Sequence, residues 1–468
     1  MRVVIQVRIH HDNEDCVDAE LIDVAEIERD GPLGVSTLGL SIDEAKQILA
    51  GIQDVVVVGQ AVTALADAAN CDGCGRRFAS KDSRTIVMRS LYGTHHVESP
   101  RWWTCPCRGE RSTFSPLAAM LAERVTPELA LVEAKLAAHM SYQASAGLLE
   151  ELFPTGRQVH RNEIARTVRR LAVRLDEDLA ADEFNYIDPR SIDRSSVPDM
   201  PMVATLDGGY VHSSRQKSRR DGWFQAVCGT VTTHDGTTRR FGFVPTVDHS
   251  PRARIRNTLD AQGLRQDQLV TFVTDGADDL AGFCEHMNFS AEYVLDWFHI
   301  AMRFTVLTNT ATGVTWTPHD DDDVEMDPAQ CTAEVDAMRE AFARAKRFLW
   351  HGNHHRTLQV LDDAADTLYC CDANTNRTKA SRMLRELIGY LENNQRRLPS
   401  YAERHRAGEP ISSGAAESAV NQVIAKRMVK KQQMRWTPTG AHHLLQIRTR
   451  VLDHQLDNDI KQWHPTPA

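Results

Sequence analysis

The sequence lacks two features that would place the chain in or beyond a membrane. We find no apolar run near the roughly 18 residues that a membrane span requires. The N-terminus, residues 1–8, alternates apolar and polar residues and has neither the apolar core nor the cleavage site of a signal peptide. The sequence therefore predicts a soluble, cytoplasmic protein without a membrane partner.

A net positive charge is also missing. The 64 acidic residues outnumber the 54 basic ones, for a formal net charge of −10, which by itself argues against a nucleic-acid partner. The distribution along the chain is more informative than the sum. An acidic run at 320–323 offsets basic residues that gather in short blocks at 215–220, 252–256 and 426–431. Local basic surfaces are therefore expected.

Cysteine is scarce and unevenly placed. Ten cysteines occur in 468 residues. Four of them fall in two tight pairs: Cys71 and Cys74, Cys105 and Cys107. In a cytosolic chain such pairs favour a metal over disulfides, and four thiolates form the closed tetrahedral set of a structural zinc site. His95 and His96 are alternative ligands, although histidines of an exposed hairpin need no metal.

A helix-turn-helix pattern follows. Residues 144–152 and 159–171 form two apolar stripes with helical spacing, and residues 153–156 interrupt them. The second helix is basic and is expected to contact DNA, with Arg161, Asn162 and Arg166 in the groove. Its candidate contacts are Arg157, Arg161, Asn162, Arg166, Arg169 and Arg170. The alternative is a solvated arginine-rich helix that binds nothing.

Strand patterns begin near residue 202. Residues 202–206, 223–231, 240–247 and 269–274 are typical of strands, with a helix between the last two. Three strands, a helix and a strand follow one another in this order in a ribonuclease H-like sheet. Residues 305–406 look almost entirely helical, so we expect a helical block to interrupt the sheet domain.

Two strand ends carry the candidate catalytic acids. Asp207 follows an apolar strand and precedes two glycines, and Asp275 takes the same position before Gly276. Rigid strand ends fix ligands at the edge of an open sheet. Two such carboxylates and a third acid can hold two Mg²⁺ or Mn²⁺ ions, about 3.5–4 Å apart, for in-line displacement at phosphorus. A single Asp-Gly pair is more commonly a turn, but two in register favour a site.

The third candidate acid is Glu417, in a helix that Gly414 opens. Helical spacing places Glu417, Ser418 and Asn421 toward one face. A glutamate in the first turn is also favourable for the helix dipole alone, which is the structural alternative.

Together these residues resemble the ISKra-type transposases of bacterial insertion sequences. The resemblance covers most of the chain beyond the first seventy residues. The segments that carry it are 115–119, 126–129, 275–277, 295–299, 349–352, 414–418 and, most strongly, 426–438. It implies a ribonuclease H-like domain with a helical insertion before the final glutamate, as in Mutator and hAT-like transposases, and it favours Glu417 as the third metal ligand. It also implies a nucleoid-associated protein of the bacterial cytoplasm.

The resemblance suggests further site residues. The family has a D-x-x-H or C-x-x-H motif at the start of the insertion, matched here by Asp296 and His299. We assign this pair a supporting role in the active site or in gripping DNA. A structural Asp and His at a helix start is the alternative.

The basic tail is expected to guide DNA to the site. Trp223, Trp297 and Trp436 could stack on an unpaired base. Stacking is expected only of Trp436, and a core position is the alternative for all three. The expected contacts of the tail are Lys426, Arg427, Lys430, Lys431, Arg435 and Trp436.

The expected fold class is multidomain α+β, with a ribonuclease H-like α/β catalytic domain that an all-helical insertion interrupts. A zinc ribbon and a helix-turn-helix domain precede it. The expected boundaries are 1–70 for a small α/β region, 71–112 for the zinc ribbon, 113–185 for the helix-turn-helix domain, 200–304 with 408–455 for the catalytic domain, and 305–407 for the insertion.

The predicted function is that of a DNA transposase. It would bind terminal inverted repeats and target DNA and, as a homodimer or higher oligomer in a synaptic complex, cleave and join strands with two Mg²⁺ or Mn²⁺ ions. One alternative is a structure-specific nuclease or resolvase with the same carboxylates. Another is a non-catalytic DNA-binding regulator, against which the intact set of acids argues.

Overall fold

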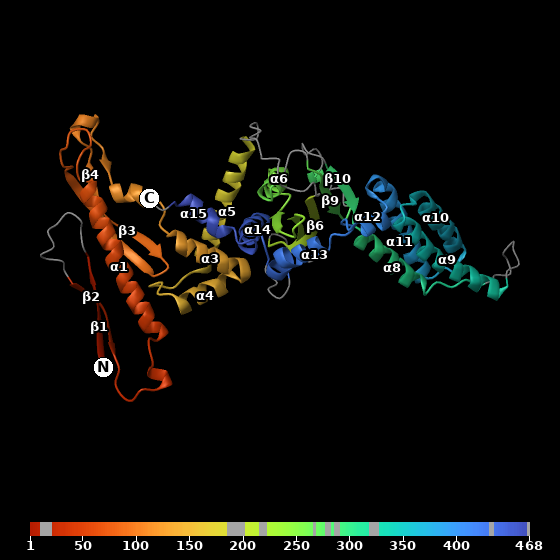
Figure 1. Ribbon diagram of the computed structural model, residues 1–468, viewed down its shortest axis with the longest axis horizontal. Coiled ribbons are helices and arrows are strands. Elements are labelled where there is room, and N and C mark those ends of the chain that lie inside the picture. The colour runs from red at the N-terminus through yellow and green to blue at the C-terminus, as the bar shows by residue number, and fades with distance from the viewer. Residues whose placement is uncertain are drawn as a thin grey trace. The chain divides into compact units, whose positions relative to one another are not determined.

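The computed structural model describes most of the chain. The described residues are 1–9, 21–184, 202–214, 222–264, 268–276, 282–284, 291–317, 327–429 and 435–465, and the side chains of 180–184 and 415–417 lie outside this description. The chain forms two compact units, Met1–Leu171 with His454–Ala468, and Ala172–Asp453. Both units contain helices and strands, so the chain is a mixed α/β multidomain protein (Figure 1).

The first unit begins with a hairpin and a long helix. β1 (Arg2–Arg8) pairs antiparallel with β2 (Leu21–Glu28), and α1 (Ile42–Asp67) follows a 3-10 turn, η1 (Val35–Thr37). A capping box starts α1, because the Ser41 side chain accepts from the Glu44 N–H and the Glu44 carboxylate accepts from the Ser41 N–H.

Helix α1 contains a long apolar stretch. By length and composition the stretch Val35–Asp67 could cross a membrane, contrary to the expectation that no such run exists. The core helix of a soluble protein, which is mostly buried, and an N-terminal signal sequence meet the same criterion, and none of the qualifying window of α1 is buried. Here α1 packs through Ala61 against Ile86, Val97 and Leu117, and localisation stays a prediction.

A three-stranded antiparallel sheet carries the cysteine pairs. β3 (Ser80–Ser90), β4 (Gly93–Trp103) and β5 (Thr113–Phe114) pair in that order. Cys71 and Cys74 precede β3, whereas Cys105 and Cys107 lie around the short turn η2 (Pro106–Arg108) after β4. The antiparallel hairpin therefore brings the two pairs to the same end of the sheet.

Helices complete the first unit. They are α2 (Pro116–Met120), α3 (Pro127–His139), α4 (Tyr142–Leu152), α5 (Arg161–Phe184), whose last turns belong to the second unit, and α15 (Leu456–Trp463). The Lys135 ammonium binds the Asp457 carboxylate at 2.8 Å and so ties α3 to α15. The two helices of the predicted helix-turn-helix are α4 and α5. The sequence had suggested that Arg157 belongs to the second helix. Because α5 begins only at Arg161, Arg157 instead lies in the connection between the two helices.

The second unit is built on a five-stranded sheet of order β10-β9-β6-β7-β8. The strands are β6 (Met202–His212), β7 (Trp223–Thr232), β8 (Thr238–Phe243), β9 (Val270–Thr274) and β10 (Ala291–Leu295). β6, β7 and β8 form an antiparallel meander, whereas β9 runs parallel to β6 and β10 parallel to β9. Helix α6 (Pro251–Ala261) connects β8 toward β9, so the expected succession of three strands, a helix and a strand is present.

One expectation about β6 is wrong. The strand does not end before Asp207 but continues to His212, and Gly208 and Gly209 pair with Val227 and Ala226 of β7. The partner strand supplies the backbone hydrogen bonds that keep these glycines extended. Asp207 therefore projects from within a strand, not from an open turn.

Helices follow β10 and pack around Phe304, Phe342 and Leu384, in a core that also includes residues of β9 and β10. They are α8 (Trp297–Ala311), α9 (Pro328–Trp350), α10 (His354–Cys370), α11 (Thr375–Asn393), η3 (Gln395–Arg397) and α12 (Tyr401–Ala407). The helical segment thus starts at Trp297, earlier than the expected residue 305.

The chain then returns to the sheet. α13 (Gly414–Ala419) and the π-helical segment η4 (Val420–Val429) pack against β6 and β7, and α14 (Pro438–Leu452) packs against β8. This return brings the segment with Glu417 to the strand that carries Asp207.

Candidate metal centres

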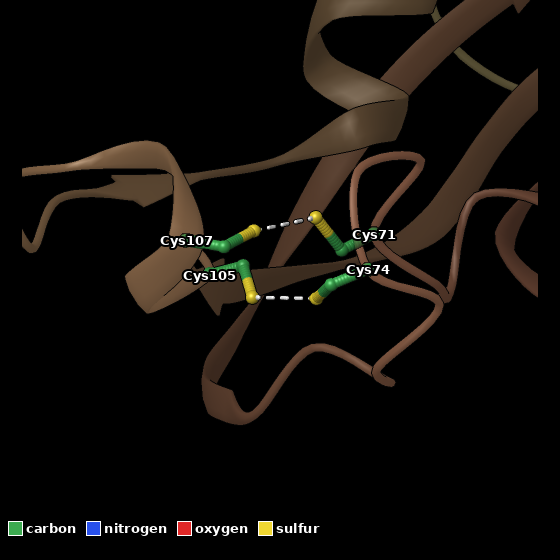
Figure 2. A group of neighbouring side chains, drawn as sticks. All are labelled: Cys71, Cys74, Cys105 and Cys107. Atoms are coloured by element: carbon green, nitrogen blue, oxygen red, sulfur yellow. Dashed lines mark hydrogen bonds between the residues drawn. The ribbon is translucent and has the colours of Figure 1, made fainter.

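Four cysteine side chains converge in the first unit (Figure 2). Their Sγ atoms all lie within 4.8 Å of one another. Cys71 and Cys107 are 3.5 Å apart, and Cys74 and Cys105 are 3.4 Å apart. A tetrahedron with Zn–S bonds of ~2.3 Å has sulfur atoms about 3.8 Å apart. The group could therefore hold a metal ion such as zinc with little rearrangement.

Local backbone turns aim these thiols at one another. The Gly75 N–H donates to the Cys71 carbonyl at 2.7 Å, and Gly75 has φ +71°, a conformation that favours glycine. On the other side, the Arg108 N–H donates to the Cys105 carbonyl at 2.9 Å across Pro106. Each pair is thus held by a tight turn of its own.

The electrostatics of the cluster favour a cation. The backbone N–H of Gly73 is the main cause that lowers the pKa of Cys71 to about 6. The neighbouring thiols, Cys105 first, raise the pKa of Cys107 to about 12. One thiolate forms readily, but the next is opposed by the charge already present. A divalent cation removes this opposition, since it binds cysteine as the thiolate.

The alternative histidine ligands are not in the cluster. His95 is buried, and its ring bonds Asp54 through Nδ1 at 2.5 Å and Ser90 through Nε2 at 2.8 Å. His96 is exposed on β4. Within the described part of the chain, the side chains close enough together to share a metal ion are the four cysteines, without a histidine.

In the second unit, three aspartates lie at the same level of the sheet, where β9 and β10 end. We call this level the aspartate edge. Leu206 of β6 pairs with Thr274 of β9, and Thr274 pairs with Leu295 of β10. Each of these residues is followed directly by an aspartate. Neighbouring strands lie roughly 4.8 Å apart. Asp207, Asp275 and Asp296 are therefore successive neighbours across this edge.

Asp207 is half-buried, and its Oδ1 accepts from the Gly208 N–H at 2.7 Å. It lies opposite Cys228 of β7. Burial raises the pKa of the Cys228 thiol well above its usual value, and the charge of Asp207 adds to the effect. A Cβ on Gly209 would meet Val420 and Ile424 of η4 at 3.2–3.3 Å, so η4 approaches β6 closely just beyond Asp207.

A hydrogen bond and a neighbouring glycine hold the backbone at Asp275 in place. Its carbonyl accepts from the Tyr390 hydroxyl at 2.7 Å. Burial raises the pKa of Tyr390 above its ordinary value, with nearby carboxylates adding to the shift, so the phenol stays a donor. The next residue, Gly276, has φ +79°, and a Cβ there would lie 2.4 Å from Leu295 Cδ1.

The structure gives Asp296 a structural role. Its side chain is fully buried, caps α8 by accepting from the Phe298 N–H at 2.7 Å, and accepts from the Ser413 hydroxyl. His299 Nε2 lies 3.7 Å from Asp296 Oδ2. This nitrogen is buried and has no hydrogen-bond partner within the described structure. The predicted pair is adjacent, but Asp296 is also the structural cap that the alternative proposed.

Glu417 lies in α13, and its side chain is outside the described part of the structure. Its helix packs against β6 and β7. Among described side chains, no three carboxylates or histidines come together as the four thiols do. The described geometry thus places two predicted acids side by side and brings the backbone of the third to the same strand.

The predicted DNA contacts of α5 are largely accessible. Arg161, Asn162, Arg166 and Arg169 are exposed. The other two predicted residues form ion pairs, Arg157 with Glu163 at 2.5 Å and Arg170 with Glu123 at 3.5 Å. The exposed basic residues of this face are therefore Arg161, Arg166 and Arg169, with Asn162 beside them.

The structure contradicts two of the DNA contacts predicted for the basic tail. Lys426 and Arg435 are exposed, but Arg427 is fully buried and Trp436 is 4% exposed, with the guanidinium 5.1 Å from the indole ring. The backbone N–H of Trp436 donates to the His212 carbonyl at 2.8 Å, which fixes the tryptophan beside β6. Neither side chain is accessible to DNA. Lys430 and Lys431, and the basic block 215–220, lie outside the described residues.

The remaining basic block and tryptophans have structural contacts. In block 252–256, Arg254 is buried between Asp176 and Asp248 and Arg256 pairs with Asp260, whereas Arg252 is exposed. Trp297 packs against Trp350 and Tyr401, as expected of a core residue. Trp223 is 47% exposed and meets His212 edge to face, so the alternative of a core position is wrong for Trp223.

Sequence reasoning missed three residues around the aspartates: Arg303, Tyr390 and Ser413. Arg303 lies over the Tyr390 ring at 4.2 Å, and Ser413 binds Asp296. Arg303 follows His299 by four residues, a helical spacing that could have indicated it. Tyr390 and Ser413 come from distant segments and had no local signal.

No model of a known protein family and no curated protein sequence matched the chain.

Proposed function

We propose that this chain is a DNA transposase of the metal-dependent DDE type, with a ribonuclease H-like catalytic domain. The observation that carries the proposal is the position of Asp207 and Asp275 directly after paired residues of two adjacent parallel strands. The succession of three strands, a helix and a strand supports it, because the sequence predicted this succession for a ribonuclease H-like sheet.

The residues at the sheet edge fit hard divalent cations. Carboxylate oxygens are the ligands that Mg²⁺ and Mn²⁺ prefer, and Asp207, Asp275 and Glu417 would hold the ions. When bound, two such ions supply an activated oxygen nucleophile and stabilise the leaving oxygen. The buried His299 Nε2, which has no hydrogen-bond partner within the described structure, fits a further polar group at this edge.

The protein residues would position the substrate. The Tyr390 hydrogen bond and the glycine conformation at residue 276 fix the backbone beside Asp275. The exposed face of α5 would bind the phosphates of the terminal repeats. The cysteine cluster would stabilise the three-stranded sheet that carries it, as a structural zinc site. Because two transposon ends must be joined, a homodimer or higher oligomer is part of the proposal.

A cleavage and strand-transfer assay tests this function. Labelled duplexes from the DNA that flanks the gene would be incubated with Mg²⁺ or Mn²⁺ and with Asp207→Asn, Asp275→Asn or Glu417→Gln. An amide keeps the shape of the acid but ligates the ions weakly, so each variant should lose cleavage and joining while it still binds the ends. Asp235→Asn, in the exposed turn between β7 and β8, is the matched control and should keep activity.

A thermal-shift measurement separates metal loss from misfolding. Mg²⁺ should raise the melting temperature of the wild type and of Asp235→Asn, but not of Asp275→Asn, since only a ligand that binds the native state stabilises it. Near wild-type turnover in any of the three acid variants would remove that residue from the site. Turnover in excess chelator would reject the metal mechanism.

A further inference from the structure

A pocket of about 500 Å³ lies beside the cysteine cluster, within the first unit. Its walls come from the two segments that carry the cysteine pairs. Arg76, Arg77 and Phe78 line one side, and Trp103, Pro106 and Arg111 line the other. A volume of this size is within the range of small-ligand sites. The pocket is distinct from both α5 and the aspartate edge.

The pocket combines positive charge with an aromatic surface. Arg76, Arg77 and Arg111 are exposed. The Trp103 ring lies 4.2 Å from the Arg111 guanidinium carbon and 5.0 Å from the Lys81 ammonium nitrogen. Cations over the face of an indole are attracted by the ring electrons, so these side chains form one stacked basic and aromatic platform.

The acids of the region do not cancel this charge. Residues 71–115 contain eight Lys and Arg residues against four Asp and Glu residues, in a chain that is negative as a whole. Two of the four acids bind arginines outside the pocket, Asp72 with Arg108 and Asp82 with Arg101. Arg76 and Arg77 enter no ion pair with the described residues. The pocket is therefore locally positive.

We propose that this pocket binds an unpaired nucleotide of a DNA strand. The base would stack on the platform of Trp103 and Arg111, and the flanking phosphates would bind Arg76 and Arg77. Basic grooves with stacking aromatics are the general means of binding single strands, because every base has a π face. A phosphate alone would need the arginines but not the half-buried indole of Trp103. The inference deepens the proposed function, on which it rests, by adding a contact to DNA that has lost its pairing.

Fluorescence anisotropy with the full-length, zinc-loaded protein tests the proposal. The probe is a labelled oligothymidylate of about ten nucleotides, titrated without Mg²⁺ in an Arg161→Ala, Arg166→Ala background that weakens the α5 surface. Trp103→Ala should weaken binding about tenfold, whereas Trp103→Phe should retain most of it. Arg76→Ala with Arg77→Ala should lower the slope of log affinity against log salt by about 1.4, or about 0.7 for each lost contact.

Arg84→Ala is the matched control for a single lost charge, because Arg84 is exposed on β3 outside the pocket. Arg111→Ala should weaken binding and Arg84→Ala should not. Equal effects of these two variants, or an affinity that Trp103→Ala leaves unchanged in a protein that still holds zinc, would overturn the proposal. So would equal affinity for a duplex of the same length. Since no step needs cleavage, a failure here leaves the catalytic proposal intact, and inactive acid variants should still bind the probe.

Discussion

Asp207 and Asp275 occupy equivalent positions on adjacent parallel strands, because the residues before them, Leu206 and Thr274, are register partners. Sequence separates the two acids by 68 positions, yet parallel pairing places them at the same level of the sheet. The third strand adds Asp296 in the same register, but its buried oxygens serve α8 and Ser413. In the proposed site Asp207 and Asp275 would hold the ions, whereas Asp296 serves the fold.

The cysteine cluster predicts bound zinc. We expect about one zinc ion per purified chain, and Cys71→Ser or Cys105→Ser should lose the metal and lower the melting temperature, because binding contributes folding free energy. Zinc affinity should fall as pH falls, since protons compete for the thiolates. Elemental analysis and calorimetry measure both effects. Cys370→Ser, exposed and outside the cluster, should change neither, and a zinc-free wild type would contradict the assignment.

The exposed face of α5 predicts a salt-dependent DNA contact. Replacing Arg161 and Arg166 by alanine should weaken binding to terminal-repeat DNA and reduce the slope of log affinity against log salt by about 0.9 for each lost phosphate contact. Arg382→Ala with Arg385→Ala, on the exposed surface of α11, removes the same charge elsewhere. Titrations at several salt concentrations that gave the same slope for both double variants would place recognition outside α5.

Gly276 predicts a large cost for a small side chain. Alanine at φ +79° is strained by about 1–2 kcal/mol, and its Cβ would meet Leu295 at 2.4 Å, which adds about 1–3 kcal/mol of overpacking. Gly263→Ala is the control, because it has φ +82° but nothing within 4 Å of the added Cβ. Denaturant unfolding should show a clearly greater loss for Gly276→Ala, and equal losses would mean that Leu295 moves aside.

Glu133 predicts a pH-dependent stability. Burial raises the pKa of this carboxyl, although the Thr167 hydroxyl donates to it. An acid whose pKa is higher in the folded than in the unfolded state favours folding when protonated, so its unfavourable contribution is present at neutral pH and disappears as pH falls through the folded pKa. Glu133→Gln should therefore raise the free energy of unfolding at pH 7, and this gain should shrink toward acid.

The exposed Glu128 of the same helix is the control for the charge itself. Glu128→Gln removes one negative charge from α3 without relieving burial, so its effect on unfolding should be small and should lack the trend with pH. A gain for Glu133→Gln that stayed constant between neutral and acidic pH would show that burial of the charge is not its cause.

The sequence by itself determined the features that depend on local geometry. The spacing of the cysteines predicted their cluster, because each pair fits a tight turn and a hairpin returns one pair to the other. Alternating and helical apolar patterns predicted β6 to β9 and the helices after them, since burial on one face leaves a period in the sequence, whereas β10 was missed. The identity of Asp207 and Asp275 as candidates also came from sequence.

Only the tertiary structure decided what depends on distant neighbours. β6 continues through Gly208 and Gly209 because β7 pairs with them, although an Asp-Gly-Gly sequence alone is typical of a turn. Arg427 and Trp436 looked like DNA contacts by composition, but the return of the tail to β6 buries both. Strand register and burial depend on segments that are distant in the sequence. The residues around a glycine or a charged side chain therefore do not reveal whether it is paired or buried.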